Sequence, residues 1–179
     1  MDVTGIVLAA GAGSRAGGPK ALSRRPDGTS WIAASCAALM AGGCARVIVV
    51  LGAAAGLARD LVPESAEIVV ADDWGNGMSA SLRAGLAAAS GDAVLVTLVD
   101  LPTLPAAVVE RVLATGGLAQ AVFGGRPGHP VLIPAAHWAA VADSLHGDRG
   151  ARAYLLAHGV TEVECGELWD GMDFDAPEA

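Results

Sequence analysis

The N-terminal sequence reads VTGIVLAAGAGSRAGGPK over residues 3–20. Its first part, Val3–Leu8, is apolar and rich in β-branched residues, which predicts a buried strand. Four glycines then follow: Gly11, Gly13, Gly17 and Gly18. Glycines let a backbone approach a ligand closely and present its N–H groups to phosphate oxygens. Arg15 and Lys20 supply the cations that an anion site needs. The segment therefore predicts a strand that leads into a phosphate-binding loop.

Outward from this loop, short apolar runs alternate with alanine-rich stretches. The further expected strands are Arg46–Leu51, Ile68–Ala71, Ala93–Val99, Gln120–Phe123, Val131–Ile133 and Val160–Glu164. The expected helices are Ser30–Met40, Ala54–Leu61, Met78–Ala89, Pro105–Ala114, Ala135–Leu145 and Ala151–Ala157, with Ser30 and Asn76 as N-caps. This alternation predicts the α/β class: a three-layer α/β/α sandwich around a mostly parallel, Rossmann-like sheet, with residues 1–179 in a single domain.

The composition limits the kinds of partner. Only 17% of the 179 residues are charged and 53% are hydrophobic, which excludes a disordered chain. A formal net charge of −8 disfavours nucleic-acid binding, although local cations or a metal can still hold a small anionic substrate. The longest uncharged run near an expected strand, Val47 to Ala58, is too short for the ~20 residues of a membrane-spanning helix. The start has no basic region of a signal peptide, and Cys36, Cys44 and Cys165 form no CxxC pair, so we expect a cytoplasmic protein with reduced thiols.

Two phosphate-binding patterns compete in the first loop. The P-loop pattern GxxxxGK[ST] is absent, because Ala21 follows Lys20. The dinucleotide pattern GxGxxA matches at Gly11, Gly13 and Ala16, but Pro19 interrupts the helix that this pattern should open. Neither pattern alone identifies the ligand.

Acidic residues supply candidate metal ligands. Asp100 ends the apolar run VLVTLVDLP, residues 94–102, at the strand end where open α/β sheets bind ligands. It is suited to Mg²⁺, with capping of the next helix as the alternative role. Asp173 and Asp175 alternate in the final segment, so both would face one side of an extended chain, unless this segment is a solvated acidic tail.

Three glycine-rich motifs remain. DWGNGMSASLRAGL, residues 73–86, places a helix N-terminus where it can contact a base or ribose, with Arg83 as either an acceptor contact or a structural partner. GGRPGHPVLIP, residues 124–134, surrounds His129, whose role as base, metal ligand or positioning residue stays open. GDRGAR, residues 147–152, offers Arg149 and Arg152 to an acceptor phosphate, or Arg149 to an ion pair. We expect His137, His146 and His158 to lie on the surface without partners, and the four tryptophans to serve packing.

Together these motifs resemble those of the nucleotidyltransferases that build molybdenum cofactor dinucleotides, in particular the cytidylyltransferases. LAAGxxxRxGxPK, GMSxSLRxGL, LxDxP, GxPGHPVxxP and GDxGAR all occur in order. The C-terminal segment is similar to the family's DxDTPED signature, but Ala176 replaces the Thr and Ala179 the last acid. The resemblance covers nearly the whole chain.

The resemblance implies roles for individual residues. Arg15 and Lys20 would contact the triphosphate and, with Asp100, form the catalytic set. Mg²⁺ would be held by Asp100, assisted by Asp173 and Asp175. Ala10, in LAAG, is similar to CTP-using members more than to GTP-using ones. The expected nucleotide contacts are Leu8, Ala9, Ala10, Gly11, Gly13, Ser14, Gly77, Met78, Ser79 and Ser81.

The leading hypothesis is transfer of a cytidylyl group from CTP to a phosphorylated, molybdopterin-type acceptor with release of pyrophosphate. A molybdoenzyme or its chaperone is then a candidate protein partner. The acceptor could also be a sugar or polyol phosphate. Two rival functions are an NAD(P)H-dependent oxidoreductase, an activity ascribed to some relatives, and a nucleotide-binding protein without catalysis.

Overall fold

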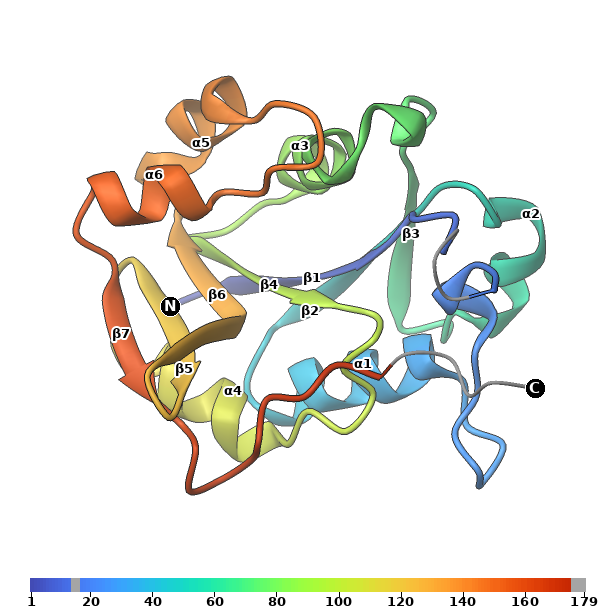
Figure 1. Ribbon diagram of the computed structural model, residues 1–179, viewed down its shortest axis with the longest axis horizontal. Helices are drawn as coiled ribbons and strands as arrows, with labels where there is room; N and C mark the ends of the chain where they lie inside the picture. The colour runs from blue at the N-terminus through green and yellow to red at the C-terminus, as the bar shows by residue number, and fades with distance from the viewer. Residues whose placement is uncertain (14–16, 175–179) are drawn as a thin grey trace.

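A seven-stranded sheet forms the centre of the structure, a computed structural model that describes residues 1–13 and 17–174 (Figure 1). Its strands are β1 (Val3–Ala9), β2 (Arg46–Leu51), β3 (Ala66–Val70), β4 (Ala93–Leu98), β5 (Ala119–Phe123), β6 (Arg126–Pro134) and β7 (Thr161–Glu164). They lie in the order β3-β2-β1-β4-β6-β5-β7. Only β6 runs against its neighbours, so the mostly parallel sheet that the sequence predicts is confirmed.

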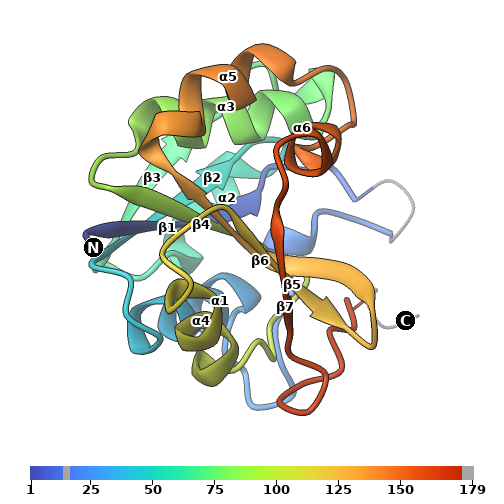
Figure 2. The same cartoon turned by 90° about the vertical axis from the view of Figure 1, so that its left-hand side faces the viewer.

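Helices cover both faces of this sheet. The α-helices are α1 (Trp31–Ala41), α2 (Ala55–Ala58), α3 (Met78–Ala88), α4 (Ala106–Leu113), α5 (Trp138–Ser144) and α6 (Arg152–Ala157). Short 3-10 helices are η1 (Lys20–Leu22), η2 (Arg59–Leu61), η3 (Trp74–Asn76) and η4 (Ala135–His137). Figure 2 shows α1 and α4 on one face and α3, α5 and α6 on the other. The predicted three-layer α/β/α architecture is therefore confirmed.

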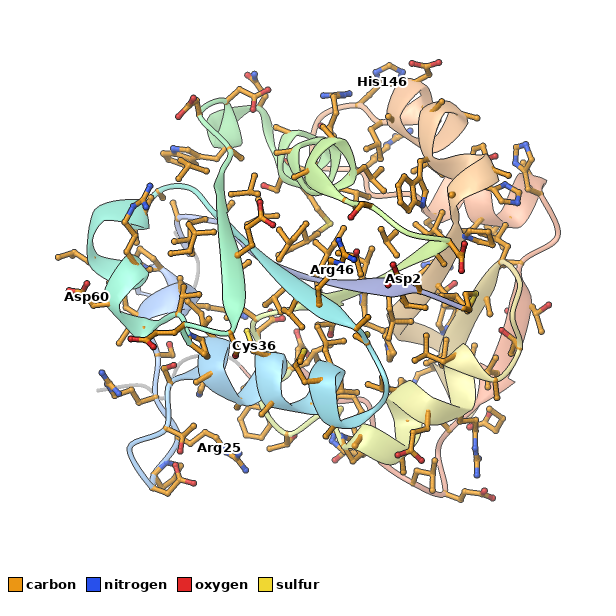
Figure 3. All side chains as sticks on the ribbon, turned by 180° about the vertical axis from the view of Figure 1, so that it is seen from behind. Asp2, Arg25, Cys36, Arg46, Asp60 and His146 are labelled. Atoms are coloured by element: carbon orange, nitrogen blue, oxygen red, sulfur yellow. The ribbon has the colours of Figure 1, made fainter. Side chains whose placement is uncertain are left out.

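Side chains that alternate along the central strands build one core on each face of the sheet. Val49 of β2 belongs to the cluster packed against α1 and α4, whereas its neighbours Ile48 and Val50 belong to the cluster packed against α3, α5 and α6. This explains the uninterrupted apolar runs in the sequence, because a strand covered on both faces needs apolar residues at every position. Cys36 of α1 points into the first core (Figure 3), where burial raises the pKa of its thiol to about 12.

Most expected elements are present within one or two residues of their predicted bounds. Ser30 caps α1 as predicted, since its Oγ accepts a hydrogen bond from the N–H of Ala33 at 3.0 Å. Asn76 is not a cap: Gly77 occupies the N-cap position of α3, with φ +98°, and no side chain caps the helix. The region 54–61 does not form one continuous helix but α2 followed by η2, and 135–145 divides into η4 and α5.

The largest difference concerns β6. The sequence predicts only Val131–Ile133 as a strand, because Pro127, Gly128 and Pro130 interrupt the apolar pattern. The observed strand begins at Arg126 and pairs with both β4 and β5. Its antiparallel direction is set by a tight connection at Gly124 and Gly125, both with positive φ, so that β6 folds directly back onto β5.

The carboxyl ends of the parallel strands meet along one edge of the sheet. The opposite edge holds the strand starts, where Arg46 and Asp2 form an ion pair at 3.3 Å and lie side by side in Figure 3. The C-terminal segment, red in Figure 1, passes along the α1 and α4 side and reaches the edge that holds the strand ends. Within the described ranges, no helix has the length and apolar character needed to cross a bilayer.

Candidate functional site

The glycine loop after β1 turns sharply at the edge of the sheet. Gly13 has a φ of +61°, and a Cβ at this position would overlap the carbonyl oxygen of Gly18. The N–H of Gly18 donates to the carbonyl of Gly13 at 3.1 Å and closes the loop. Only glycine satisfies both the conformation and the space at this position. Ser14 and Arg15, which the sequence assigns to the nucleotide, lie outside the described residues.

Lys20 and Asp100 meet beside this loop. Lys20 begins η1, and its Nζ lies 3.0 Å from Oδ2 of Asp100, which follows β4. Their side chains are only 18% and 17% exposed. The other carboxylate oxygen, Oδ1 of Asp100, is buried and has no hydrogen-bond partner among the described residues. A buried oxygen without a donor is costly, so this atom is suited to a ligand that supplies positive charge.

The C-terminal segment contacts the same strand end. The backbone N–H of Phe174 donates to the carbonyl oxygen of Asp100 at 2.8 Å, and its ring packs edge-on against buried Trp31. Exposed Asp173 directly precedes Phe174, the residue that contacts Asp100, whereas Asp175 lies outside the described residues. In the part of the chain that the structure describes, no three His, Cys, Asp or Glu side chains gather as a metal site.

The start of α3 is packed against the loop that carries the GDRGAR motif. The N–H of Ser79 donates to the carbonyl of Gly147 at 3.1 Å, and a Cβ on Gly77 would overlap the Asp148 carboxylate. Two motifs that are 70 residues apart in the sequence thus form one wall. Ser79 is buried with its N–H already used, so it does not present that group to a ligand as the sequence predicts.

A cavity of about 450 Å³ joins these parts along the sheet edge. It brings together most residues predicted to bind the nucleotide or catalyse: Leu8, Ala9, Ala10, Gly11, Gly13, Lys20, Gly77, Met78, Ser81 and Asp100. Trp74, Gly75 and Asp148, which the sequence does not predict as nucleotide contacts, also line it. Two signals could have found them: Trp74 directly precedes the glycines of the GMS motif, and Asp148 lies within GDRGAR.

A second cavity of about 320 Å³ adjoins the first and shares Leu8, Met78 and Asp148 with it. Most of its wall is apolar: Leu82, Val96, Pro127, Val131, Ile133, Ala151 and Leu155. Its polar side chains include Gln120, which is bonded to the carbonyl of Gly128 at 3.0 Å, together with His129 and Arg152. Arg149, the other arginine of the motif, lines neither cavity.

His129 is uncharged at neutral pH. The protein surrounds its imidazole closely, although one side faces the second cavity, and this burial lowers the pKa of His129 to about 4. The negative charge of Asp100 opposes the shift, which places the two side chains within electrostatic reach of each other. A neutral imidazole can donate and accept hydrogen bonds without adding charge to the apolar wall.

Arg83 has structural contacts. Its guanidinium donates to the carbonyl oxygens of Leu145 at 2.9 Å and Ala142 at 3.4 Å, and so ties α3 to the end of α5. It lines neither cavity. The sequence leaves two roles open for Arg83, an acceptor contact or a structural partner. The observed contacts are those of a structural partner.

The prediction that His137 and His158 have no partners is wrong. Nδ1 of His137 lies 2.9 Å from the Tyr154 hydroxyl, and Nδ1 of His158 lies 2.8 Å from the Tyr154 carbonyl oxygen. The His158 ring also stacks on Tyr154 with centroids 3.8 Å apart. The sequence obscures this group because Tyr154 and His137 are separated by a loop and meet only when α6 packs beside η4.

Comparisons with known proteins agree with the fold. A family model described as the MobA-like NTP transferase domain matches residues 5–163. A relative from Paenarthrobacter nicotinovorans, named nicotine blue oxidoreductase, is 38% identical over 191 residues, which cover 98% of this chain and 93% of the relative.

Solved structures are similar along nearly the whole chain. Rv0371c from Mycobacterium tuberculosis H37Rv is 28% identical with a TM-score of 0.80, covering 98% of this chain and 94% of that one. A structure of Rv0371c in complex with manganese is 25% identical with a TM-score of 0.77, covering 92% and 88%. The arrangement of strands and helices is therefore shared with these proteins.

Proposed function

Because this chain belongs to the family of MobA-like NTP transferase domains, we propose that it transfers a nucleotidyl group from an NTP to a phosphorylated acceptor and releases pyrophosphate. The favoured donor is CTP, and the favoured acceptor is a molybdopterin-type cofactor. One observation carries the proposal: the first cavity combines a glycine loop, Lys20 and an Asp100 oxygen without a partner, and it adjoins a second cavity across a shared wall.

The charges of the first cavity support a divalent cation. Its described wall carries two carboxylates, Asp100 and Asp148, against the single cation of Lys20. A triphosphate would be repelled by this balance unless further positive charge entered with it. The unpartnered Oδ1 of Asp100 is a hard oxygen ligand of the type that Mg²⁺ prefers, and Mg²⁺ takes only one or two carboxylates and keeps several waters.

In this proposal Asp100 holds Mg²⁺, with Asp173 and Asp175 as further ligands. The manganese complex of Rv0371c supports a divalent cation in this fold. When bound, the cation would offset the charge that develops on the leaving pyrophosphate. Lys20, which is held on Oδ2 of Asp100, would donate to phosphate oxygens together with Arg15. The glycine loop would present its backbone N–H groups to the same oxygens.

The acceptor would occupy the second cavity. Arg152 lines this cavity and would bind the acceptor's phosphate, which would attack the α-phosphorus in line with the leaving pyrophosphate. Such a phosphate is already ionised at neutral pH, so the step needs no strong base. The uncharged His129 agrees with a role in positioning the acceptor by hydrogen bonding rather than in removing a proton.

A second candidate function is oxidoreduction, which the name of the 38% identical relative favours, and we take NAD(P)H as its reductant from the GxGxxA match. The local geometry differs from a dinucleotide-binding site of the Rossmann type. The loop leads into the short η1 rather than a full helix, and at the end of β2 stands Gly52, where a Cβ would lie 2.5 Å from the carbonyl oxygen of Ala10. No acidic side chain can therefore stand at Gly52 itself to bind a ribose, as that motif requires.

One set of measurements separates these functions. Thermal-shift assays with Mg²⁺ should rank CTP above GTP, ATP, UTP and NADPH, and pyrophosphate should be released when CTP and the acceptor are both present. A loss of nicotinamide absorbance with an oxidised dye, without pyrophosphate release, would contradict the transferase and support the oxidoreductase. Binding of CTP without either reaction would indicate a nucleotide-binding protein.

A further inference from the structure

Trp74 differs from the other three tryptophans. It is 37% exposed, whereas Trp31 is buried. The indole N–H groups of Trp138 and Trp169 donate to Ile133 and Thr103. Among residues 1–13 and 17–174, the indole N–H of Trp74 has no acceptor and its ring has no aromatic neighbour. Trp74 is expected, like the other three, to serve packing, but part of its aromatic surface also lines the first cavity.

The position of Trp74 is fixed by its surroundings. The backbone N–H of Trp74 donates to the carbonyl of Ala71 at 3.1 Å, and its backbone carbonyl accepts from the N–H of Gly77 at 3.0 Å. Gly52 leaves just enough space for its stem, because a Cβ on Gly52 would lie 2.7 Å from Cβ of Trp74. An aromatic ring on an anchored backbone loses little conformational entropy when a ligand packs on it.

The first cavity has two chemically different ends. Lys20 and Asp100 lie where β4 ends, while Trp74 packs against Gly52, where β2 ends. In the sheet β2 and β4 are separated by β1, so two strand spacings of ~4.8 Å place the ends roughly 10 Å apart. The glycine loop after β1 lies between them. The charged end suits phosphates and the aromatic end suits a flat, uncharged ring, which is the division of chemistry within a nucleotide.

We infer that Trp74 is the surface on which the nucleobase of the bound NTP stacks, an inference that rests on the proposed function. The base lies on the indole while the triphosphate extends past the glycine loop toward Lys20 and Asp100. Every base has a π-face, so stacking contributes affinity without choosing between bases. The choice of CTP is then left to Ala10 and to the start of α3.

The test compares two probes, CTP and inorganic tripolyphosphate, each with Mg²⁺, by calorimetry. Trp74→Ala should weaken CTP binding between about fivefold and about 100-fold, the range found when a stacking aromatic is removed. Binding of tripolyphosphate, which has no base, should change less than about twofold. Leu57→Ala, which truncates a 71% exposed side chain outside both cavities, is the matched control and should leave both affinities unchanged.

Trp74→Phe keeps a ring at this position and should bind CTP nearly as well as the wild type. The fluorescence change that CTP causes in the wild type should nevertheless be largely lost in Trp74→Phe, because the other three tryptophans lie outside the first cavity. The ratio of CTP to GTP affinity should stay the same in Trp74→Ala within about twofold, since stacking tolerates any base.

The possible failures are distinguishable. Unchanged CTP affinity in Trp74→Ala overturns the inference, as does an equal loss for CTP and tripolyphosphate, which would mean that the variant damages the phosphate end. Wild-type protein that binds tripolyphosphate but not CTP also overturns it. If the wild type binds neither probe, the proposed function fails and the inference fails with it.

Discussion

The two cavities share Leu8, Met78 and Asp148 but differ in the rest of their walls. The first combines glycine-rich backbone and a charged pair, Lys20 and Asp100, with the aromatic surface of Trp74. The second is built mainly from aliphatic side chains, with Arg152 and an uncharged His129 as its ionisable groups beside Asp148. One compartment is thus suited to a highly charged ligand, and the other to a ligand with an apolar body and a single anionic group.

This difference indicates that the two cavities have separate functions, one for the donor and one for the acceptor. Nucleotidyl transfer requires groups that stabilise the negative charge developing on the donor's phosphates. The acceptor needs only to be oriented, because its phosphate is already a nucleophile. Changes in the first cavity should therefore affect donor binding and turnover, and changes in the second should affect the apparent affinity for the acceptor. Variants with a substitution in only one cavity test that separation.

The largest effect is expected for Asp100→Asn, which keeps the shape of the side chain and removes its charge. If Asp100 holds Mg²⁺, the loss of transition-state stabilisation is several kcal/mol, so pyrophosphate release should fall by at least about 100-fold. Thermal stability should change little, since the carboxylate is a partly buried group at a strand end. The measurement is Mg²⁺-dependent pyrophosphate release at saturating CTP.

Asp173→Asn is the matched control for that variant. It makes the same change in the exposed segment beside Asp100, and it should reduce turnover less than Asp100→Asn. Full Mg²⁺-dependent turnover in Asp100→Asn would show that the metal site is wrongly assigned and would remove the mechanism built on it. An unchanged Asp173→Asn variant would restrict the site to Asp100 and the nucleotide.

Lys20→Ala should weaken CTP binding by about tenfold or more, because a charge-assisted hydrogen bond contributes about 1.5–3 kcal/mol. Lys20 is the only lysine of the chain. A lysine-directed acylating reagent therefore labels one side chain besides the N-terminus, and CTP with Mg²⁺ should protect it. Equal labelling with and without nucleotide, or an unchanged calorimetric Kd, would argue against a triphosphate contact.

Arg152→Ala tests the second cavity. It should raise the KM for the acceptor by about tenfold through the loss of a charge-assisted contact, while the Kd for CTP stays within about twofold. Arg149→Ala, in the same loop but outside both cavities, is the control and should change neither value. An Arg152→Ala variant with weaker CTP binding and an unaltered acceptor KM would reverse the assignment of the two cavities.

The sequence contains most of the information about the first cavity. The residues around Ala10, Lys20 and Asp100 belong to short motifs at strand ends, and parallel strands bring their carboxyl ends together without further information. The first part of β6 could not be predicted, because its prolines and glycines suppress strand propensity and only the pairing of Arg126 and Pro127 with β5 reveals it.

Contacts between distant segments could not be predicted in this way. The packing of Gly147 and Asp148 against Gly77 depends on how α5 and the following loop lie over α3. The bond between Phe174 and Asp100 likewise depends on the path of a segment without regular structure. The neutral state of His129 follows from burial, which a motif of glycines and prolines does not specify.

The smallest effect concerns that neutral state and appears in stability rather than turnover. Burial lowers the pKa of His129 from 6.5 to about 4, so between these values the unfolded chain binds a proton that the folded chain does not. The contribution of neutral His129 to the free energy of unfolding is therefore complete above pH 6.5 and declines as the pH falls toward 4, by about 2 kcal/mol at pH 5.

His129→Gln cannot bind this proton, so the free energies of unfolding in urea at pH 7 and pH 5 should differ less in this variant than in the wild type. His146→Gln, an exposed histidine outside both cavities, should retain the wild-type difference (Figure 3). If His129→Gln and the wild type lose equal stability on acidification, folding does not lower the pKa of His129, and its imidazole adds charge to the apolar wall of the second cavity as the pH falls.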